Sequence, residues 1–155
     1  MSYYSGARSV ECAAGTTRKG STHLARRDLI VTDDLLERLS RIESNGNTKA
    51  IGDHGRSLGL FQFTPEAWTE VNNLRARQGL GRVSLSARTN PNRARSFASA
   101  YLQKLHNDFS ATQGKEPTRA QLYALWNLGP RGFQRRGFSL SNCPEATQRA
   151  ARRME

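Results

Sequence analysis

Glu43 is the side chain whose place in the sequence most clearly suggests chemistry. At about 100° per residue it projects between Leu36 and Leu39, inside the apolar stripe of a predicted helix. It also stands at the carboxyl end of that helix, where the helix dipole disfavours an anion. Burial and the dipole both raise the pKa of a carboxyl group, which favours a protonated Glu43 near neutral pH. Such a group suits general acid catalysis, and the alternative is a glutamate at a frayed helix end that reaches water.

Two further motifs follow Glu43-Ser44 along the chain. Residues 57–65 read Ser-Leu-Gly-Leu-Phe-Gln-Phe-Thr-Pro, and residues 125–130 read Leu-Trp-Asn-Leu-Gly-Pro. In this order, over about residues 30–135, the three motifs resemble those of the lytic transglycosylase and goose-type lysozyme superfamily. In that family a Glu-Ser pair ends a helix, a Gly-x-Gly-Leu-Met-Gln segment follows, and Ala-Tyr-Asn-x-Gly-Pro comes third.

The resemblance implies a substrate and a set of site residues. The substrate is bacterial peptidoglycan, cleaved at the β-1,4 bond between N-acetylmuramic acid and N-acetylglucosamine, with Glu43 as the general acid and base. Phe61 replaces the family's methionine and Trp126 replaces its tyrosine. The positions that match the family's substrate-binding motifs are Ser44, Gly59, Leu60, Phe61, Gln62, Trp126 and Asn127.

Several of these residues have a purely structural alternative. Because Gly59 lacks a Cβ, its backbone would allow a sugar to approach closely. The amide of Gln62 either orients a sugar hydroxyl or N-acetyl group, or holds its own loop by a hydrogen bond. Phe61 and Phe63 line either a sugar subsite or the core, and the core is favoured for at least one of them. Asn127 bonds the substrate, the catalytic carboxyl, or a group at the end of its own helix.

Asp53 is the candidate second carboxylate. It lies in Gly52-Asp53-His54-Gly55, which looks like the aspartate-bearing loop of goose-type lysozymes. A second aspartate of those enzymes would fall on Thr64, which carries no charge. The alternative is that Asp53 only turns its own glycine-rich loop. Hydrolysis and formation of a 1,6-anhydro product therefore both stay open.

No cofactor or metal is expected. The chain has three histidines, His23, His54 and His106, and their wide spacing argues against a zinc site. The two cysteines, Cys12 and Cys143, either pair in an oxidising compartment or remain thiols. Neither has a histidine close in sequence, which argues against a catalytic thiol.

The elements that must position these residues are predicted to be helical. Residues 29–155 are predicted to form one mainly α, lysozyme-like domain with a small glycine-rich β-hairpin or loop at residues 53–63. Residues 1–28 contain small and polar types without apolar periodicity and are predicted to form a flexible basic arm. The five predicted helices start near residues 33, 65, 91, 119 and 144, and the fourth is expected to end at Gly129-Pro130.

The charge of the chain favours an anionic partner. Among 155 residues, 24 are Lys or Arg and 13 are Asp or Glu, which gives a net charge of +11. The basic residues are scattered from Arg8 to Arg153, so much of the charge is a solvated surface and nucleic acid is the less favoured partner. The anionic bacterial wall fits better. The rival function is a non-catalytic basic binding module for glycan or nucleic acid.

The sequence also carries expectations about location. No apolar run of about 18 residues is present, so no helix is expected to span a membrane. Action on the cell wall implies a periplasmic, extracellular, phage-associated or secretion-system-associated protein. No signal peptide is visible, and the export route stays open. The protein is expected to be a monomer.

Overall fold

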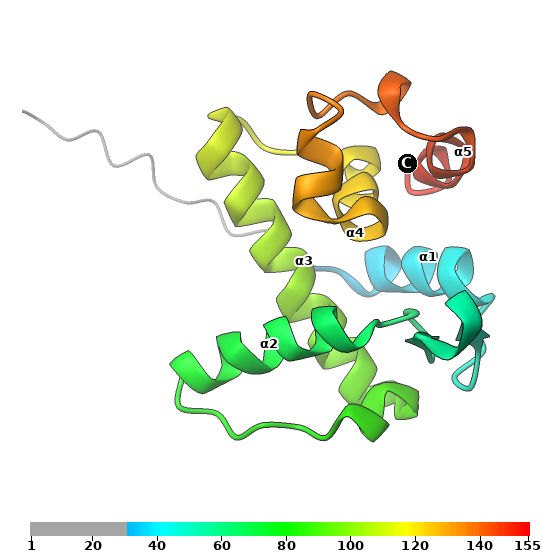
Figure 1. Ribbon diagram of the computed structural model, residues 1–155, viewed down its shortest axis with the longest axis vertical. Helices are drawn as coiled ribbons and strands as arrows, with labels where there is room; N and C mark the ends of the chain where they lie inside the picture. Colours follow the sequence, from blue (N-terminus) through cyan, green and yellow to red (C-terminus); the bar gives the residue numbers. More distant parts are fainter. Residues whose placement is uncertain (1–30) are drawn as a thin grey trace, which may run out of the picture.

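A computed structural model describes residues 31–155, which form five α-helices and a two-stranded antiparallel sheet. The mainly α fold with a small hairpin is therefore confirmed. In Figure 1, α3 (Pro91–Gln113) crosses the molecule, and α1 (Asp33–Ser44) lies between two groups of elements. One group is α4 (Arg119–Gln134) with α5 (Glu145–Arg152), and the other is α2 (Pro65–Arg77) with the hairpin. The predicted arm at residues 1–28 lies outside the described residues.

The helix that carries Glu43 begins and ends as its sequence predicts. The Thr32 hydroxyl accepts a hydrogen bond from the Leu35 amide at 3.2 Å, and two aspartates occupy the first turn. The helix ends at Ser44, and Asn45 takes the left-handed conformation that satisfies the last carbonyls. Leu35, Leu36 and Leu39 are buried. The stripe that includes Glu43 therefore faces the protein interior.

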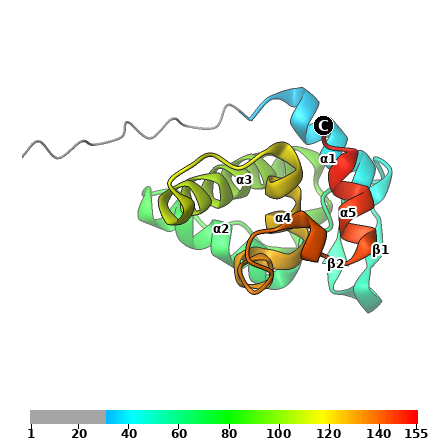
Figure 2. The same cartoon turned by 90° about the horizontal axis from the view of Figure 1, so that it is seen from above.

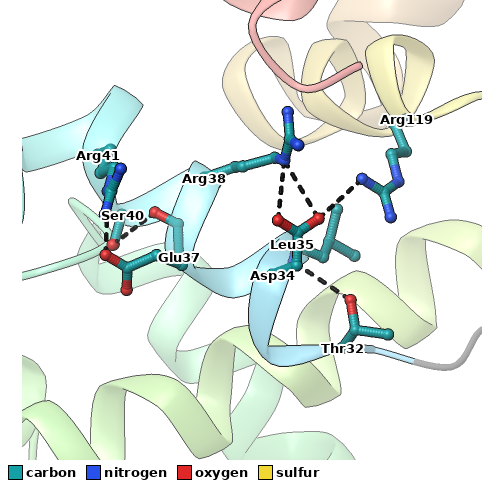
Figure 3. A network of polar contacts seen from close by, with 8 residues as sticks. All are labelled: Thr32, Asp34, Leu35, Glu37, Arg38, Ser40, Arg41 and Arg119. Atoms are coloured by element: carbon teal, nitrogen blue, oxygen red, sulfur yellow. Dashed lines mark hydrogen bonds and ion pairs between the residues drawn. The ribbon is translucent and has the colours of Figure 1, made fainter.

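The outer face of α1 is polar and is tied to the start of α4. Figure 3 shows the Asp34 carboxylate between Arg38 and Arg119, each with a nitrogen 3.1 Å from a carboxylate oxygen. One turn further on, Glu37 pairs with Arg41 at 3.0 Å. These pairs are exposed, so each is expected to contribute about 0–1 kcal/mol. They define the face of α1 that points away from Glu43.

The glycine-rich segment forms the predicted hairpin. Strand β1 (Ile51–Gly52) pairs with β2 (Ser57–Leu58), with Ile51 opposite Leu58 and Gly52 opposite Ser57. The short 3-10 helix η1 (Asp53–Gly55) makes the turn between them. After β2 the chain turns back once more, because the Leu58 and Phe63 backbones pair with each other. The segment is therefore folded tightly on itself before α2 begins.

Helices α2 and α3 form the central core. Each begins with a capping side chain and a proline in its first turn, Thr64 with Pro65 and Asn90 with Pro91. Trp68 of α2 stacks on Phe97 of α3 with ring centroids 3.7 Å apart. The connection between the two helices, predicted only as polar, contains a further 3-10 helix, η2 (Leu85–Thr89). This short helix packs against the hairpin segment and becomes important for the site.

The end of α4 differs from its prediction. The helix was expected to stop at Gly129-Pro130, but a helical turn continues to Gln134. Gly129 does break the regular helix, with φ 70° and ψ 161°. Pro130 then starts a new turn, where its missing N–H is not needed. The basic stretch that follows includes the 3-10 helix η3 (Leu140–Asn142) before α5 begins.

Gly59 is required by packing within the protein. Its φ is +79°, and a Cβ built there would lie 2.1 Å from the backbone oxygen of Arg88. The backbone of η2 therefore fills the space on the Cβ side of Gly59, where the sequence predicts that a sugar approaches. Gly59 is buried, and a close approach of substrate to its backbone stays a prediction.

We expect Gly59→Ala to lower the free energy of unfolding by about 3 kcal/mol or more, because it combines a left-handed backbone with overpacking. Gly81→Ala is the matched control, because a Cβ at Gly81 meets no atom within 4 Å. That variant should change the free energy by less than about 1 kcal/mol. Urea unfolding of both proteins measures the difference, and equal effects would contradict the packing argument.

Candidate active site

The side chain of Glu43 is half-buried. Its Oε1 is buried and has no hydrogen-bond partner among the described residues. Burial raises the pKa of Glu43 to about 7. The nearby Tyr123 hydroxyl opposes this rise, and the negative charge of Asp53 adds to it. The raised pKa agrees with the direction expected from the sequence, and it keeps a large share of the carboxyl groups protonated near neutral pH.

Direct contacts join the three motifs. Ser44, next to Glu43, donates a hydrogen bond from its hydroxyl to the backbone oxygen of Leu60 at 2.7 Å. Phe61 meets the ring of Trp126 edge-on, with centroids 6.4 Å apart. The end of α1, the glycine-rich segment and the middle of α4 therefore form one continuous unit. No local feature of the sequence brings these segments together.

Two of the predicted substrate contacts lie in the core. Phe61 is completely buried and Leu60 is 7 % exposed. Of the two alternatives for Phe61 and Phe63, burial selects the core for both side chains, since Phe63 is 2 % exposed. Leu60 and Phe61 therefore belong to the core, and a contact of either residue with substrate stays a prediction. Trp126 is only half-buried and keeps part of its surface accessible.

Gln62 is engaged with its own loop. Its Nε2 donates to the backbone oxygen of Gly59 at 2.9 Å and to that of Ala50 at 3.2 Å. Its Oε1 lies against Gly52, where a Cβ would come within 2.3 Å. Gln62 also has a positive φ of 49°. Gln62 therefore holds its own loop by hydrogen bonds, as one of its two alternatives predicted. Substrate contact by Gln62 stays a prediction.

Asp53 lies at the turn of the hairpin. It is exposed and has a left-handed φ of 47°, so it does turn its own loop. Its carboxylate accepts a hydrogen bond from the hydroxyl of Ser57, which is buried. Because its charge acts on Glu43, the two carboxyl groups belong to the same neighbourhood. Within residues 31–155 no group of three His, Cys, Asp or Glu side chains is placed to hold a metal ion.

Asn127 is held by a helix that follows the motif region. It is exposed, and its Oδ1 accepts a hydrogen bond of 2.8 Å from the Thr147 hydroxyl of α5. This bond is none of the three alternatives that the sequence suggested. With its oxygen engaged, the Asn127 amide can offer its two N–H donors to a ligand. Figure 2 shows α5 on the same side of the molecule as α1 and the hairpin.

Tyr123 is the residue near Glu43 that the sequence reasoning missed. It is 4 % exposed, and burial together with the charge of Glu43 raises the pKa of its hydroxyl. Tyr123 lies one helical turn before Asn127, at the i, i+4 spacing that places both on one face of α4. That spacing was the available signal. The family's motif has its tyrosine at the position of Trp126, so the hydroxyl here comes from a different residue.

A hollow of about 410 Å³ lies beside the outer face of α1. Its lining residues are Asp34, Glu37, Arg38, Arg41, Ile42 and Arg153. Glu43 points to the opposite face of the helix and does not line it. That Glu43, Gln62 and Asn127 share one cleft therefore stays a prediction.

Comparison with known proteins gives one match. The family model of the Transglycosylase SLT domain matches residues 25–137. No curated protein and no solved structure matches the chain. No helix of residues 31–155 is long and apolar enough to cross a membrane. Since the family match spans well over half of the chain and includes all three motifs, the protein belongs to the Transglycosylase SLT domain family, which supports a lytic-transglycosylase-like function on peptidoglycan.

Proposed function

We propose that the protein cleaves the β-1,4 bond between N-acetylmuramic acid and N-acetylglucosamine, with Glu43 as the general acid and then the general base. The observation that carries this proposal is the half-buried Glu43, whose Oε1 is buried and has no partner among the described residues. A protonated carboxyl with an unengaged oxygen can donate to an incoming acceptor without first breaking another bond. We further propose that residues 29–155 form the catalytic domain and that it acts as a monomer.

The proposed first step is proton transfer. The Glu43 proton passes to the glycosidic oxygen while the bond from that oxygen to the anomeric carbon breaks, and its electron pair stays on the oxygen. The muramic acid ring then carries positive charge at the anomeric carbon. The Glu43 carboxylate, now ionised, is the base for the second step. The Tyr123 hydroxyl supports this stage because it stabilises the charged form.

Two second steps fit this site. If the 6-hydroxyl of the same sugar attacks, its proton returns to Glu43 and a 1,6-anhydro ring closes. If water attacks, its proton is taken by Glu43 or by a second carboxylate, and a reducing end forms. Asp53 is the candidate second carboxylate because its charge acts on Glu43. We favour bond cleavage by Glu43 in both cases and propose Asp53 as the residue that distinguishes them.

The substrate charge complements the protein. Peptidoglycan is anionic and the chain carries +11, so attraction over long distances should concentrate the enzyme on the wall at low salt. This location is periplasmic or extracellular. Asn127, with its N–H donors available, is proposed to bind an oxygen of the sugar or its N-acetyl group.

Glu43→Gln should lower the rate of peptidoglycan cleavage by about 100-fold or more, because the amide has no proton to transfer. Glu37→Gln on the outer face of the same helix is the matched control and should keep wild-type activity, since the Glu37 carboxylate pairs with Arg41 and Arg95 and not with a group of the site. Release of soluble fragments from purified peptidoglycan measures both. Activity within a few-fold of wild type in Glu43→Gln would refute the assignment of Glu43, whereas no cleavage by the wild-type protein would leave the binding-module function.

The pH dependence should report Glu43 in two ways. Cleavage, as kcat/KM, should fall as the pH rises through about 7, where the acid loses its proton. The free energy of unfolding should also fall between pH 4.5 and about 7, because the folded protein binds a proton that the unfolded chain releases. Glu43→Gln should remove up to about 3 kcal/mol of this fall. Urea unfolding at pH 5 and pH 8 tests it, and an identical pH dependence in the variant would contradict the raised pKa.

Asp53→Asn separates the two second steps. If a carboxylate helps water, the hydrolytic product should fall steeply. If the 6-hydroxyl attacks, the anhydro product should persist at a similar rate. Mass spectrometry of the released muropeptides distinguishes the products by one water. A variant with the wild-type rate and an unchanged hydrolytic product would exclude Asp53 from the site.

A further inference from the structure

We infer that Arg88 is a positioning residue for this site: its guanidinium clamps both ends of the segment 57–62 and thereby fixes the groups that surround Glu43. The inference deepens the proposed function and rests on it. Arg88 lies in η2, a part of the chain outside all three motifs.

Three hydrogen bonds form the clamp. Nη1 of Arg88 donates to the backbone oxygen of Arg56 at 2.8 Å and to that of Phe63 at 2.9 Å. Nε donates to the backbone oxygen of Leu85 at 3.1 Å, which fixes the side chain to its own 3-10 helix. Arg56 and Phe63 directly flank the segment 57–62. One guanidinium nitrogen therefore holds the two ends of this segment together.

The clamped segment makes the contacts that reach the surroundings of Glu43. Ser57 donates to the Asp53 carboxylate, and the Leu60 oxygen accepts from Ser44, the neighbour of Glu43. The backbone of Arg88 adds a second contact in the middle of the segment, because its oxygen lies against Gly59. The segment is thus held at both ends and at its centre by one residue.

The burial of Arg88 supports a specific role. The side chain is 6 % exposed, and burial lowers the pKa of its guanidinium. Glu66, whose charge acts on Arg88, is paired with Arg56 at 2.7 Å instead. Among residues 31–155 the guanidinium is bonded to backbone oxygens alone, so its desolvation is offset by these hydrogen bonds. An apolar side chain would fill the same space without the cost of desolvating a charge, but it could not donate hydrogen bonds to the three backbone oxygens.

The clamp has a measurable consequence at Glu43. The groups that act on its carboxyl are Asp53 from the hairpin and Tyr123 from α4, together with burial itself. A loosened segment would admit water and let Asp53 move away. Both changes favour the ionised carboxyl, so both lower the pKa of Glu43.

The test is Arg88→Lys, which keeps the positive charge but replaces the planar fork by a compact ammonium. The control is Arg56→Lys, an exposed residue at the edge of the same segment whose side chain pairs only with Glu66. The pKa of Glu43 is read from its side-chain carboxyl carbon by NMR titration, and kcat and KM are measured across the same pH range. The melting temperature of each variant is recorded alongside.

We expect Arg88→Lys to lower the pKa of Glu43 by about one unit and to move the upper limb of the pH–activity profile down with it. The value of kcat should fall about tenfold, with a smaller change in KM. Arg56→Lys should change neither. A lower melting temperature with an unchanged Glu43 pKa would overturn the inference and leave Arg88 a stabilising residue only.

Two further outcomes are informative. If Arg88→Lys does not fold, Ser57→Ala removes the link from the clamped segment to Asp53, and an unchanged Glu43 pKa there would overturn the inference. If the pKa falls in Arg88→Lys but the wild-type protein cleaves no peptidoglycan, the positioning role stands and the proposed function fails. The NMR measurement keeps the two hypotheses separate because it needs no activity.

Discussion

Removal of one carboxyl group from water is the constraint on which the site depends. Glu43 stands where a helix ends, and the position would ordinarily expose its side chain. The side chain is half-buried, Asp53 of the hairpin and Tyr123 of α4 act on it, and burial raises its pKa to about 7. The enclosure destabilises the charged form, and this is the property that makes the group useful as an acid.

The enclosure is built by polar contacts to the backbone as much as by apolar packing. Ser44, Gln62 and Arg88 each bond backbone oxygens of the glycine-rich region. These bonds stabilise a segment that has little regular secondary structure, since β1 and β2 have two residues each. The positive φ values of Asp53 and Gln62 show that the backbone is held in conformations that favour glycine. A segment held in this way keeps its shape at the site without a large sheet.

The sequence predicted the helices well because their signals are local. Thr32, Asn90 and Thr118 cap the helices that were expected to start near residues 33, 91 and 119, and Thr118 forms a capping box with Gln121. The position of Glu43 in an apolar stripe was predicted from the helical repeat, which is also a local signal. Contacts between segments that are distant in sequence could not be predicted from local signals. Arg88 bonds Arg56 across 32 residues, and one arginine among many in a basic chain carries no visible signal. The true neighbour of Gly59, a backbone oxygen of η2, was invisible for the same reason.

The contacts between α5 and α4 extend the folded domain beyond the residues that the family model matches. The recurrent family segment ends at residue 137, but Met154 is fully buried and Ala151 is 1 % exposed. The side chain of Glu155 accepts a hydrogen bond from the Ala120 amide at 3.1 Å, at the start of α4. The unit that recurs among proteins is therefore shorter than the unit that folds here. The final eighteen residues supply an apolar face to α4 and a hydroxyl to Asn127, so the extent of the family match underestimates how much of this chain supports the site.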